Sequence, residues 1–482
     1  MTAIEPAPAG YPLELRTFTP LRDTKGPIRL RYGADIGDAM SPRKPGPSYD
    51  LRGADGGFGG APWTFVLLPR GEQSATDFKW SWDLTALPQG ARSVSVRGEG
   101  DLQWRDVPSS LYTMFFLAGQ VDGYSPESSP FGSYWTGKPP FDAQAAARWS
   151  ARSFAALQGF FRDEDARPYT LLMRPFARPR DGGGATQGGF MLEYGKGEMS
   201  DDARRIMFTH EMVHHFVGGL DGDSSANAWF GEGLAEFYKI RLPLRAGLIE
   251  LKAAAEQMAV MTDAYYASPM VNVPYADVAA QRWAGGDAQS TPYNRGFMYF
   301  VTVDAAVRER SNGMRSLDDL VLAMLASRHA GGGYDVPKWR SLLQAELGDA
   351  GVVDFEKMLG GEVLEPPAHA FGPCFARTTE RRPRPLLGFS EDAILSAPHT
   401  VSDLQPGSAA ETAGLRNGDV ILRFTGATPR IAHSASNLVL SPRIDLVVRR
   451  GDKELSVSFS TEGPPVIFHR WNLAPGHSAC VL

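Results

Sequence analysis

The chain has 482 residues, of which 43% are hydrophobic and 22% charged, and its formal net charge is −6. This composition is typical of a soluble globular protein, the length predicts two to four domains, and the negative charge argues against a nucleic-acid-binding protein. No apolar run approaches the ~18 residues that a transmembrane segment needs, so we expect no membrane span.

Two features bear on the compartment. Residues 1–10 lack the basic and then apolar stretches of a secretory signal peptide. We therefore expect a cytoplasmic protein or, if a targeting segment has been removed, a periplasmic or cell-envelope one. Two cysteines do not form a disulfide framework, and free thiols are the default expectation. Cys374 and Cys480 flank the last predicted domain, so a single disulfide is the alternative.

Residues 1–135 are expected to form an all-β, sandwich-like domain. Short runs of apolar or alternating residues are separated by Gly and Pro, and no helix-length periodicity is found. The predicted strands are 13–18, 28–32, 63–68, 78–82 and 93–96. The expected role of this domain is to brace a catalytic domain.

Helical patterns begin after residue 139. Asp142 can cap a helix over 143–161, and a short buried strand is predicted at 169–173. A glycine-rich stretch, 182–189, leads into a second strand at 190–194.

Glycine allows close approach of another backbone, so the glycine-rich stretch predicts an edge strand that receives extended substrate. A flexible hairpin is the alternative. The candidate substrate-binding residues are Gly183, Gly184, Thr186 and Gln187.

The next predicted helix starts at Ser200, ends at Gly218 and carries the sequence His-Glu-Met-Val-His at 210–214. Residues four apart share one face of a helix, so His210 and His214 can bind one metal ion. Glu211 can reach a water molecule on that ion and act as a general base.

A second helix, around residues 229–238, supplies Glu232 as the third ligand. Two His and one Glu leave one tetrahedral position for water, which predicts one catalytic Zn²⁺ per chain. Glu236, one turn further on, can accept a hydrogen bond from the outer nitrogen of a ligand histidine. His215 lies about 100° around its helix from His214, so we expect it to pack or support rather than ligate the same ion.

Four further helices are predicted at 248–266, 296–310, 316–328 and 337–347, the third with a capping-box-like start. The catalytic domain is therefore expected to span 136–372. Residues 378–385 are basic and proline-rich, which predicts a linker over 373–385.

A β pattern returns at 386–463, with the segments Gly-Ser-Ala-Ala at 407–410, Ala-Gly-Leu at 413–415 and Gly-Asp-Val-Ile at 418–421. This region resembles a PDZ domain, which implies binding of extended peptides or of the C termini of other proteins. The loop expected to receive the carboxylate comprises Leu386, Leu387, Gly388 and Phe389. A brace between domains is the alternative role, and the tail, 464–482, is unassigned.

The zinc pattern, together with Gly-Glu-Gly-Leu-Ala-Glu-Phe-Tyr at 231–238, is similar to the gluzincin metallopeptidases. The added β domain and PDZ-like domain resemble the glycyl aminopeptidase family. The resemblance implies a thermolysin-like, mainly helical α+β catalytic domain that acts on peptide or protein substrates. It also implies that Tyr293, in Tyr-Asn-Arg-Gly at 293–296, stabilises the oxyanion.

The sequence departs from the family pattern at two places. Between His214 and Glu232 lie 17 residues, one fewer than is usual in gluzincins. The family's glycine-rich strand continues with a glutamate that anchors a free substrate amine, whereas Thr186 stands here and Glu193 is only a weak candidate. Three hypotheses stay open: an aminopeptidase-like zinc peptidase, an endopeptidase or other amide hydrolase, and a PDZ-type scaffold with a vestigial metal site.

Overall fold

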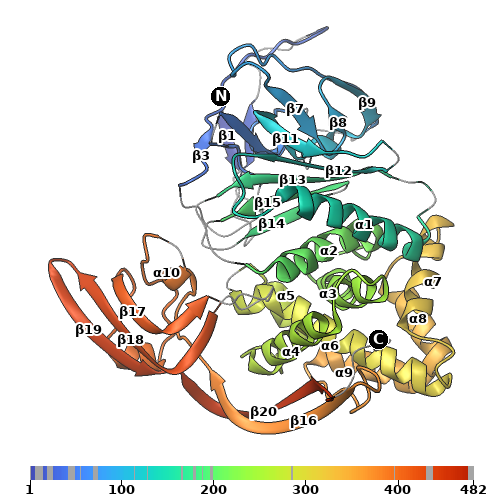
Figure 1. Ribbon diagram of the computed structural model, residues 1–482, viewed down its shortest axis with the longest axis vertical. Coiled ribbons are helices and arrows are strands. Elements are labelled where there is room, and N and C mark those ends of the chain that lie inside the picture. The colour runs from blue at the N-terminus through green and yellow to red at the C-terminus, as the bar shows by residue number, and fades with distance from the viewer. Residues whose placement is uncertain are drawn as a thin grey trace.

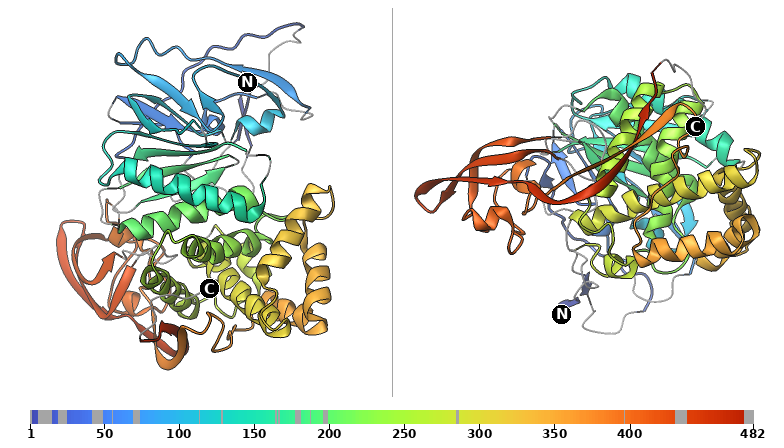
Figure 2. Two further views of the ribbon diagram at one scale, coloured as in Figure 1. Left: turned by 45° about the vertical axis from the view of Figure 1, so that its right-hand side comes forward. Right: turned by 90° about the horizontal axis from the view of Figure 1, so that it is seen from below.

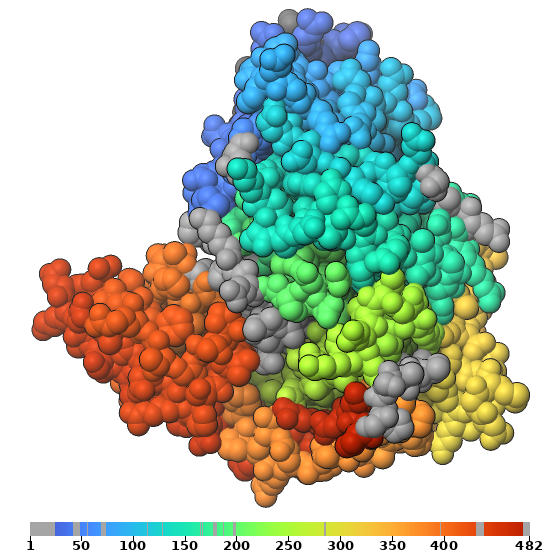
Figure 3. All heavy atoms as spheres, viewed as in Figure 1, coloured from blue at the N-terminus to red at the C-terminus, as the bar shows by residue number. Residues whose placement is uncertain are grey.

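The computed structural model describes residues 2–475 except 6–14, 19–24, 42–48, 55, 69–73, 113, 128, 164, 166, 177–180, 187, 196–198, 284–285, 396 and 430–437. A β-rich N-terminal part lies at one end of the long axis, and a helical body lies at the other (Figure 1). A small C-terminal β module protrudes from one side of this body (Figure 3).

The N-terminal part contains three antiparallel or mixed sheets. The largest has six strands in the order β3-β4-β5-β10-β7-β8. Their bounds are β3 (Gly37–Asp38), β4 (Arg52–Ala54), β5 (Gly57–Gly60), β10 (Phe116–Gly119), β7 (Arg92–Ser95) and β8 (Gly98–Glu99). The other two sheets of the N-terminal part have two strands each. One pairs β1 (Thr2–Glu5) with β2 (Leu15–Phe18), and the other pairs β6 (Thr76–Trp80) with β9 (Leu102–Asp106). Two 3-10 turns, η1 (Pro62–Thr64) and η2 (Pro108–Leu111), link these strands.

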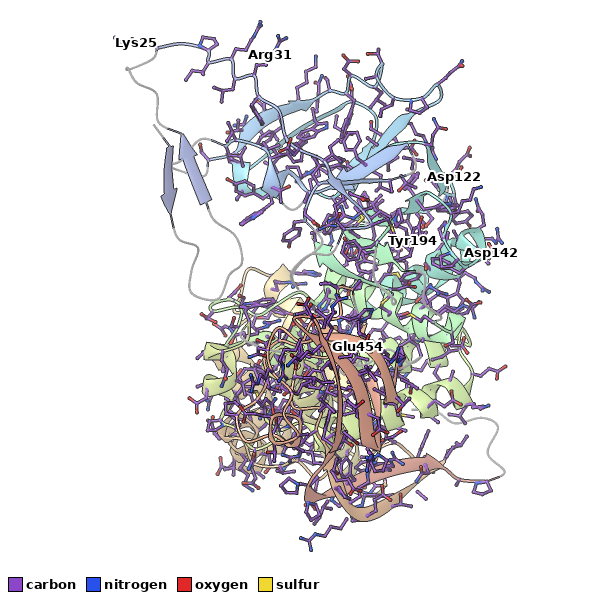
Figure 4. All side chains as sticks on the ribbon, turned by 90° about the vertical axis from the view of Figure 1, so that its left-hand side faces the viewer. Lys25, Arg31, Asp122, Asp142, Tyr194 and Glu454 are labelled. Carbon is purple, nitrogen blue, oxygen red and sulfur yellow. The ribbon has the colours of Figure 1, made fainter. Side chains whose placement is uncertain are left out.

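Two of the strands predicted here are wrong. Residues 28–32 are unpaired, and Ile28 and Leu30 are each 61% exposed. This segment runs along the outside of the N-terminal part, where Figure 4 labels Arg31. The run 63–68 begins within η1, because Pro62 has no N–H and its fixed φ suits the first turn of a helix. Strands β2, β6 and β7 confirm the other three predictions.

A five-stranded sheet carries the helical body, in the order β11-β12-β13-β15-β14. The strands are β11 (Val121–Tyr124), β12 (Phe131–Thr136), β13 (Tyr169–Pro175), β15 (Gly189–Tyr194) and β14 (Gly182–Thr186). The central strands β12, β13 and β15 are parallel, and β14 is an antiparallel edge strand. Strand β11 and all but the last residue of β12 precede residue 136, so this sheet begins before the predicted start of the catalytic domain.

Both faces of this sheet are buried, which explains its continuous apolar strands. Successive side chains alternate between faces. Leu171 and Leu192 pack in the core of the helical body, whereas Leu172 and Met191 pack in the N-terminal core. Helices α1 (Ala143–Phe161) and α2 (Asp201–Val217) lie along the first of these faces (Figure 1).

The helical body contains the four further predicted helices and two that were not predicted. The remaining helices are α3 (Ala228–Arg245), α4 (Leu251–Ala267), α5 (Tyr275–Ala280), α6 (Gly286–Arg310), α7 (Leu317–His329), α8 (Val336–Leu347) and α9 (Asp349–Gly360). Helix α6 begins earlier than predicted and so includes Tyr293, while α5 and α9 are new. Helices α3 and α6 cross at Gly233 and Gly296, where a Cβ on Gly233 would lie 2.5 Å from the Cα of Gly296. Only glycine permits this approach.

The predicted linker and the unassigned tail form one β ribbon. Strand β16 (Phe375–Pro385) pairs with β20 (Glu462–Leu473). Prolines fit because each strand of a two-stranded ribbon has a free edge that needs no N–H donor. The ribbon crosses beneath the helical body (Figure 2), and Phe468 and Trp471 are buried in the main core. It is therefore a structural part of the body.

The C-terminal module has a core of its own and a three-stranded antiparallel sheet. The strands are β17 (Val420–Pro429), β18 (Leu438–Arg450) and β19 (Lys453–Ser460), with short helices α10 (Asp392–Leu395) and α11 (Ala409–Thr412). The strand edge predicted to adjoin the loop Leu386–Phe389 is not formed by the described residues that follow it, because 390–395 fold into a turn and α10. The N–H of Leu386 already donates to the carbonyl of Thr461 at 2.8 Å.

Two global expectations can be compared with the structure. Cys374 is disulfide-bonded, so the default expectation of a free thiol is wrong for this residue, and Cys480 lies outside the described residues. None of the helices formed by the described residues is long and apolar enough to cross a membrane.

Candidate metal centre

Helix α2 presents the two histidines. Its first turn is stabilised by the Ser200 side chain, which accepts a hydrogen bond from the N–H of Ala203, and by two aspartates that complement the helix dipole. The helix ends at Gly218, whose positive φ of 64° suits glycine. His210 and His214 lie on the face that meets α3, which brings Glu232 opposite them.

Three possible ligand atoms converge between these helices. The Nε2 atoms of His210 and His214 are 3.1 Å apart. Oε2 of Glu232 lies 3.2 Å from Nε2 of His214 and 3.5 Å from Nε2 of His210. Ligand atoms bound tetrahedrally about 2.0–2.1 Å from one zinc ion lie roughly 3.3 Å apart. The donor set and its spacing therefore fit a zinc ion.

The other oxygen of Glu232 has a separate partner. Oε1 lies 3.2 Å from Nη2 of Arg282, whose Nη1 donates to the carbonyl of Ser224 at 3.3 Å. One carboxylate oxygen thus faces the histidines while the other is held by a guanidinium. Arg282 was not predicted, because it lies between α5 and α6 and no sequence spacing connects it to Glu232.

His210 is held from behind by Glu236. Nδ1 of His210 lies 2.9 Å from Oε1 of Glu236, and both side chains are buried. Burial lowers the pKa of His210, but the contacts with Glu232 and Glu236 outweigh this and raise it to about 9. A proton on Nδ1 directs the Nε2 lone pair toward the possible metal position. The contact is the one that the spacing predicts, and its role in metal binding stays a prediction.

Glu236 also contacts a lysine that the sequence analysis did not select. Oε2 of Glu236 lies 2.5 Å from Nζ of Lys239, one turn further along α3. Lys239 is fully buried, and this burial lowers its pKa while Glu236 opposes the shift. The sequence offered one signal for this residue: a lysine within a helical stretch of apolar residues is expected to be buried and paired.

Glu211 and Tyr293 border the same centre. Burial raises the pKa of Glu211 above its usual range, and His210 and His214 oppose this effect. The ring of Tyr293 stacks on that of His210, with centroids 5.6 Å apart and planes 12° from parallel. Burial and then Glu232 and Glu211 hold the pKa of Tyr293 well above its usual range. Its phenol therefore stays protonated and able to donate a hydrogen bond.

His215 takes no part in the metal centre. Its ring lies against the aromatic rings of Phe154, Tyr169 and Phe216. Burial lowers its pKa to about 4, and it is therefore neutral near pH 7. This is the packing position expected for it.

The proposed substrate strand, β14, is an edge strand of the central sheet among the described residues, and most of it is half-buried. A Cβ on Gly183 would lie 2.1 Å from the carbonyl oxygen of Met191, whereas no atom lies within 4 Å of a Cβ built on Gly184. Oγ1 of Thr186 is buried and has no hydrogen-bond partner among the residues that the structure describes. Gln187 lies outside the described residues.

Glu193 cannot serve as an anchor for a substrate amine. It is fully buried, and its Oε1 lies 2.6 Å from Nη2 of Arg174. Arg174 also donates from Nη1 to the carbonyl of Gly59, so this ion pair joins the sheet to the N-terminal part. The prediction that Glu193 could anchor a substrate amine is therefore wrong.

Comparisons with known proteins place the fold but not the activity. No protein family and no curated protein matches the sequence. The fold is similar to that of an aminopeptidase N family protein from Idiomarina loihiensis, with a TM-score of 0.62, 13% identity and coverage of 86% of this chain and 81% of that one. The protein thus shares the multidomain fold of that protein.

Two other solved structures are less similar. An M1 zinc metallopeptidase mutant from Deinococcus radiodurans, bound to a Tyr-Ser-Ala substrate, has a TM-score of 0.45, 16% identity and coverage of 69% of this chain and 75% of that one. Leukotriene A4 hydrolase from Saccharomyces cerevisiae has a TM-score of 0.39, 12% identity and coverage of 57% and 45%.

Proposed function

We propose that the protein is a zinc-dependent metallopeptidase that hydrolyses peptide bonds in peptide or protein substrates. One Zn²⁺ per chain would be bound by His210, His214 and Glu232. The observation that carries this proposal is the convergence of Nε2, Nε2 and Oε2 at separations of 3.1, 3.2 and 3.5 Å.

The surrounding side chains suit hydrolysis of an amide. When bound, zinc in such a site polarises a water molecule and the substrate carbonyl. Glu211 takes the proton that leaves the attacking water and passes it to the leaving amine, a role that a raised carboxyl pKa favours. The hydroxyl of Tyr293 donates a hydrogen bond to the oxygen on which negative charge develops.

Substrate would bind in an extended conformation along β14. An edge strand has unpaired backbone N–H and C=O groups on one side, and a peptide can add to it as a further strand. Gly184 leaves room for the approaching backbone, while Gly183 is required for the contact with β15.

We further propose a role for each domain. Residues 1–135 brace the catalytic region, 136–372, and supply β11 and most of β12 to its sheet. The module at 386–463 is PDZ-like and either recruits the C-terminal ends of peptides or acts as a brace. The disulfide at Cys374 favours the periplasmic or cell-envelope alternative, because disulfides persist in oxidising compartments.

The favoured activity is aminopeptidase-like with a relaxed requirement for a free N terminus. A buried substrate ammonium needs a carboxylate partner, yet Thr186 stands at the expected position and Glu193 is paired with Arg174. This observation keeps endopeptidase activity as the second candidate. A scaffold with a vestigial metal site is disfavoured, because the three ligands and Glu211 are all intact.

A peptide library with free and acetylated N termini tests these alternatives. Cleavage-product mapping should show hydrolysis near the N terminus, with acetylation lowering turnover by less than ~10-fold, since a paired charge contact would contribute more than the corresponding ~1.4 kcal/mol. If acetylation abolishes cleavage, the protein is a strict aminopeptidase that requires a free N terminus. If only internal peptide bonds are cleaved, it is an endopeptidase. Absence of any cleavage by zinc-loaded protein would contradict the proposed function.

A further inference from the structure

Lys239 is a cation enclosed in the protein core behind the metal centre. Its side chain has no exposed surface, whereas lysine is normally found at the protein surface. Taking an ammonium group out of water is costly unless an anion and hydrogen bonds compensate for the loss of solvent. A buried lysine at this place therefore calls for a functional explanation.

The compensating anion is the carboxylate that also holds a metal-site histidine. Nζ of Lys239 lies 2.5 Å from Oε2 of Glu236, and Oε1 of Glu236 lies 2.9 Å from Nδ1 of His210. All three side chains are at least 97% buried. One carboxylate therefore bridges a buried ammonium and the imidazole of a candidate metal ligand.

We propose that Lys239 is a positioning residue of the metal centre, which acts on His210 through Glu236. This inference rests on the proposed zinc site. A carboxylate held at one oxygen by an ammonium can no longer rotate freely, so its other oxygen stays at hydrogen-bond distance from Nδ1. The imidazole then keeps both its ring orientation and the tautomer in which Nε2 faces the metal position.

The charges around the centre agree with this role. Glu211, Glu232 and Glu236 lie close together in the described structure and repel one another. Arg282 compensates for this charge at Oε1 of Glu232, and Lys239 does so at Oε2 of Glu236. Each of these two cations therefore holds the carboxylate oxygen that does not face a histidine.

A double-mutant cycle separates this role from a simple contribution to packing. Lys239→Met removes the charge and keeps an unbranched side chain that is one atom shorter, Glu236→Gln removes the bridging anion, and the double variant removes both. Lys252→Met is the matched control, because Lys252 lies on α4 with its side chain 81% exposed. The readouts are zinc affinity, measured by competition with a chelator, and the melting temperature of the metal-free protein.

Each single variant should bind zinc about 10–100-fold more weakly, the usual effect of losing a residue that supports a metal ligand. The double variant should be no weaker than Glu236→Gln alone, because in this proposal Lys239 affects His210 through Glu236. The Lys252→Met control should keep wild-type affinity.

Three results would overturn the proposal: wild-type affinity in folded Lys239→Met, penalties that multiply in the double variant, or a double variant that binds zinc as tightly as the wild type. If Lys239→Met does not fold, the double variant decides, because it leaves no unpaired buried charge. Equal affinity of the double variant and Glu236→Gln supports the role, and unequal affinity refutes it. A wild-type protein that binds no zinc would instead refute the proposed function itself.

Discussion

At the scale of single residues, the three glutamates of the candidate metal centre differ in the partners of their carboxylate oxygens. Oε2 of Glu232 lies close to the histidines and Oε1 lies close to Arg282, an orientation that would suit metal binding through one oxygen. Glu236 offers one oxygen to His210 and the other to Lys239. Glu211 forms no such close ion pair among the described residues, although His210 and His214 act on its charge, and in the proposed function its carboxylate transfers the proton.

Helix geometry explains which of these residues the sequence could predict. Spacings of four residues along a helix fix which side chains share a face, and this is why His210, His214 and Glu236 could be selected. Arg282 contacts Glu232 only through tertiary placement, so no local pattern identifies it. Lys239 lies three residues after Glu236 on the same helix, so its spacing and its apolar surroundings were a local signal that the sequence analysis did not use.

Glu211→Gln should lower peptide hydrolysis by at least ~10²-fold, because the attacking water loses its proton acceptor. The amide has nearly the same shape, so zinc content and melting temperature should match the wild type. Steady-state kinetics on a short peptide with metal analysis checks both. Near-wild-type hydrolysis by this variant would mean that another group is the base.

Tyr293→Phe should lower kcat by about 10²–10³-fold with little change in KM, since the hydroxyl contacts charge that develops only in the transition state. The ring stacked on His210 is retained, so zinc affinity should not change. An effect confined to KM would reassign Tyr293 to binding of the ground-state substrate.

At the scale of elements, the centre depends on how closely neighbouring segments approach. The α3–α6 crossing at Gly233 and Gly296 brings Tyr293 to the histidines, and β14 lies at the sheet edge with space beside Gly184. Helices with clear caps, such as α1 and α7, could be predicted from sequence. The β16–β20 ribbon could not, because it pairs segments that lie far apart in sequence.

Gly183 and Gly184 offer a matched pair of variants for the substrate strand. Gly184→Val should raise KM by about 10-fold and leave the melting temperature unchanged, because the side chain occupies the space that the substrate backbone needs. Gly183→Val should instead lower the melting temperature, because its side chain would clash with the Met191 carbonyl. Unchanged kinetics in Gly184→Val would argue against substrate binding along β14.

At the scale of the whole molecule, the C-terminal module is attached through a ribbon that belongs to the catalytic body. Phe468 and Trp471 of β20 are buried in the main core, and Arg382 contacts Asp263 of α4 at 3.1 Å. The module itself packs around a different core. Removal of the module and removal of the ribbon are therefore different experiments.

The module can be excised while the ribbon is kept. Pro385 and Glu462 are paired, so a two-residue Asn-Gly turn can replace 386–461. This variant should fold and cleave short peptides normally, and it should lose activity only on long substrates if the module recruits them. Deletion of 380–482, the matched comparison, should unfold the protein or lower its melting temperature strongly. Loss of short-peptide hydrolysis in the excised but folded variant would contradict a separable module.

Zinc titration of the metal-free protein tests the central claim most directly. Hydrolysis of a short peptide should rise linearly with added zinc and level off at about one equivalent per chain, because one site binds the ion. His214→Ala, which lacks a ligand, should neither retain zinc nor gain activity. Hydrolysis that needs no metal, or undiminished zinc binding by His214→Ala, would contradict the account.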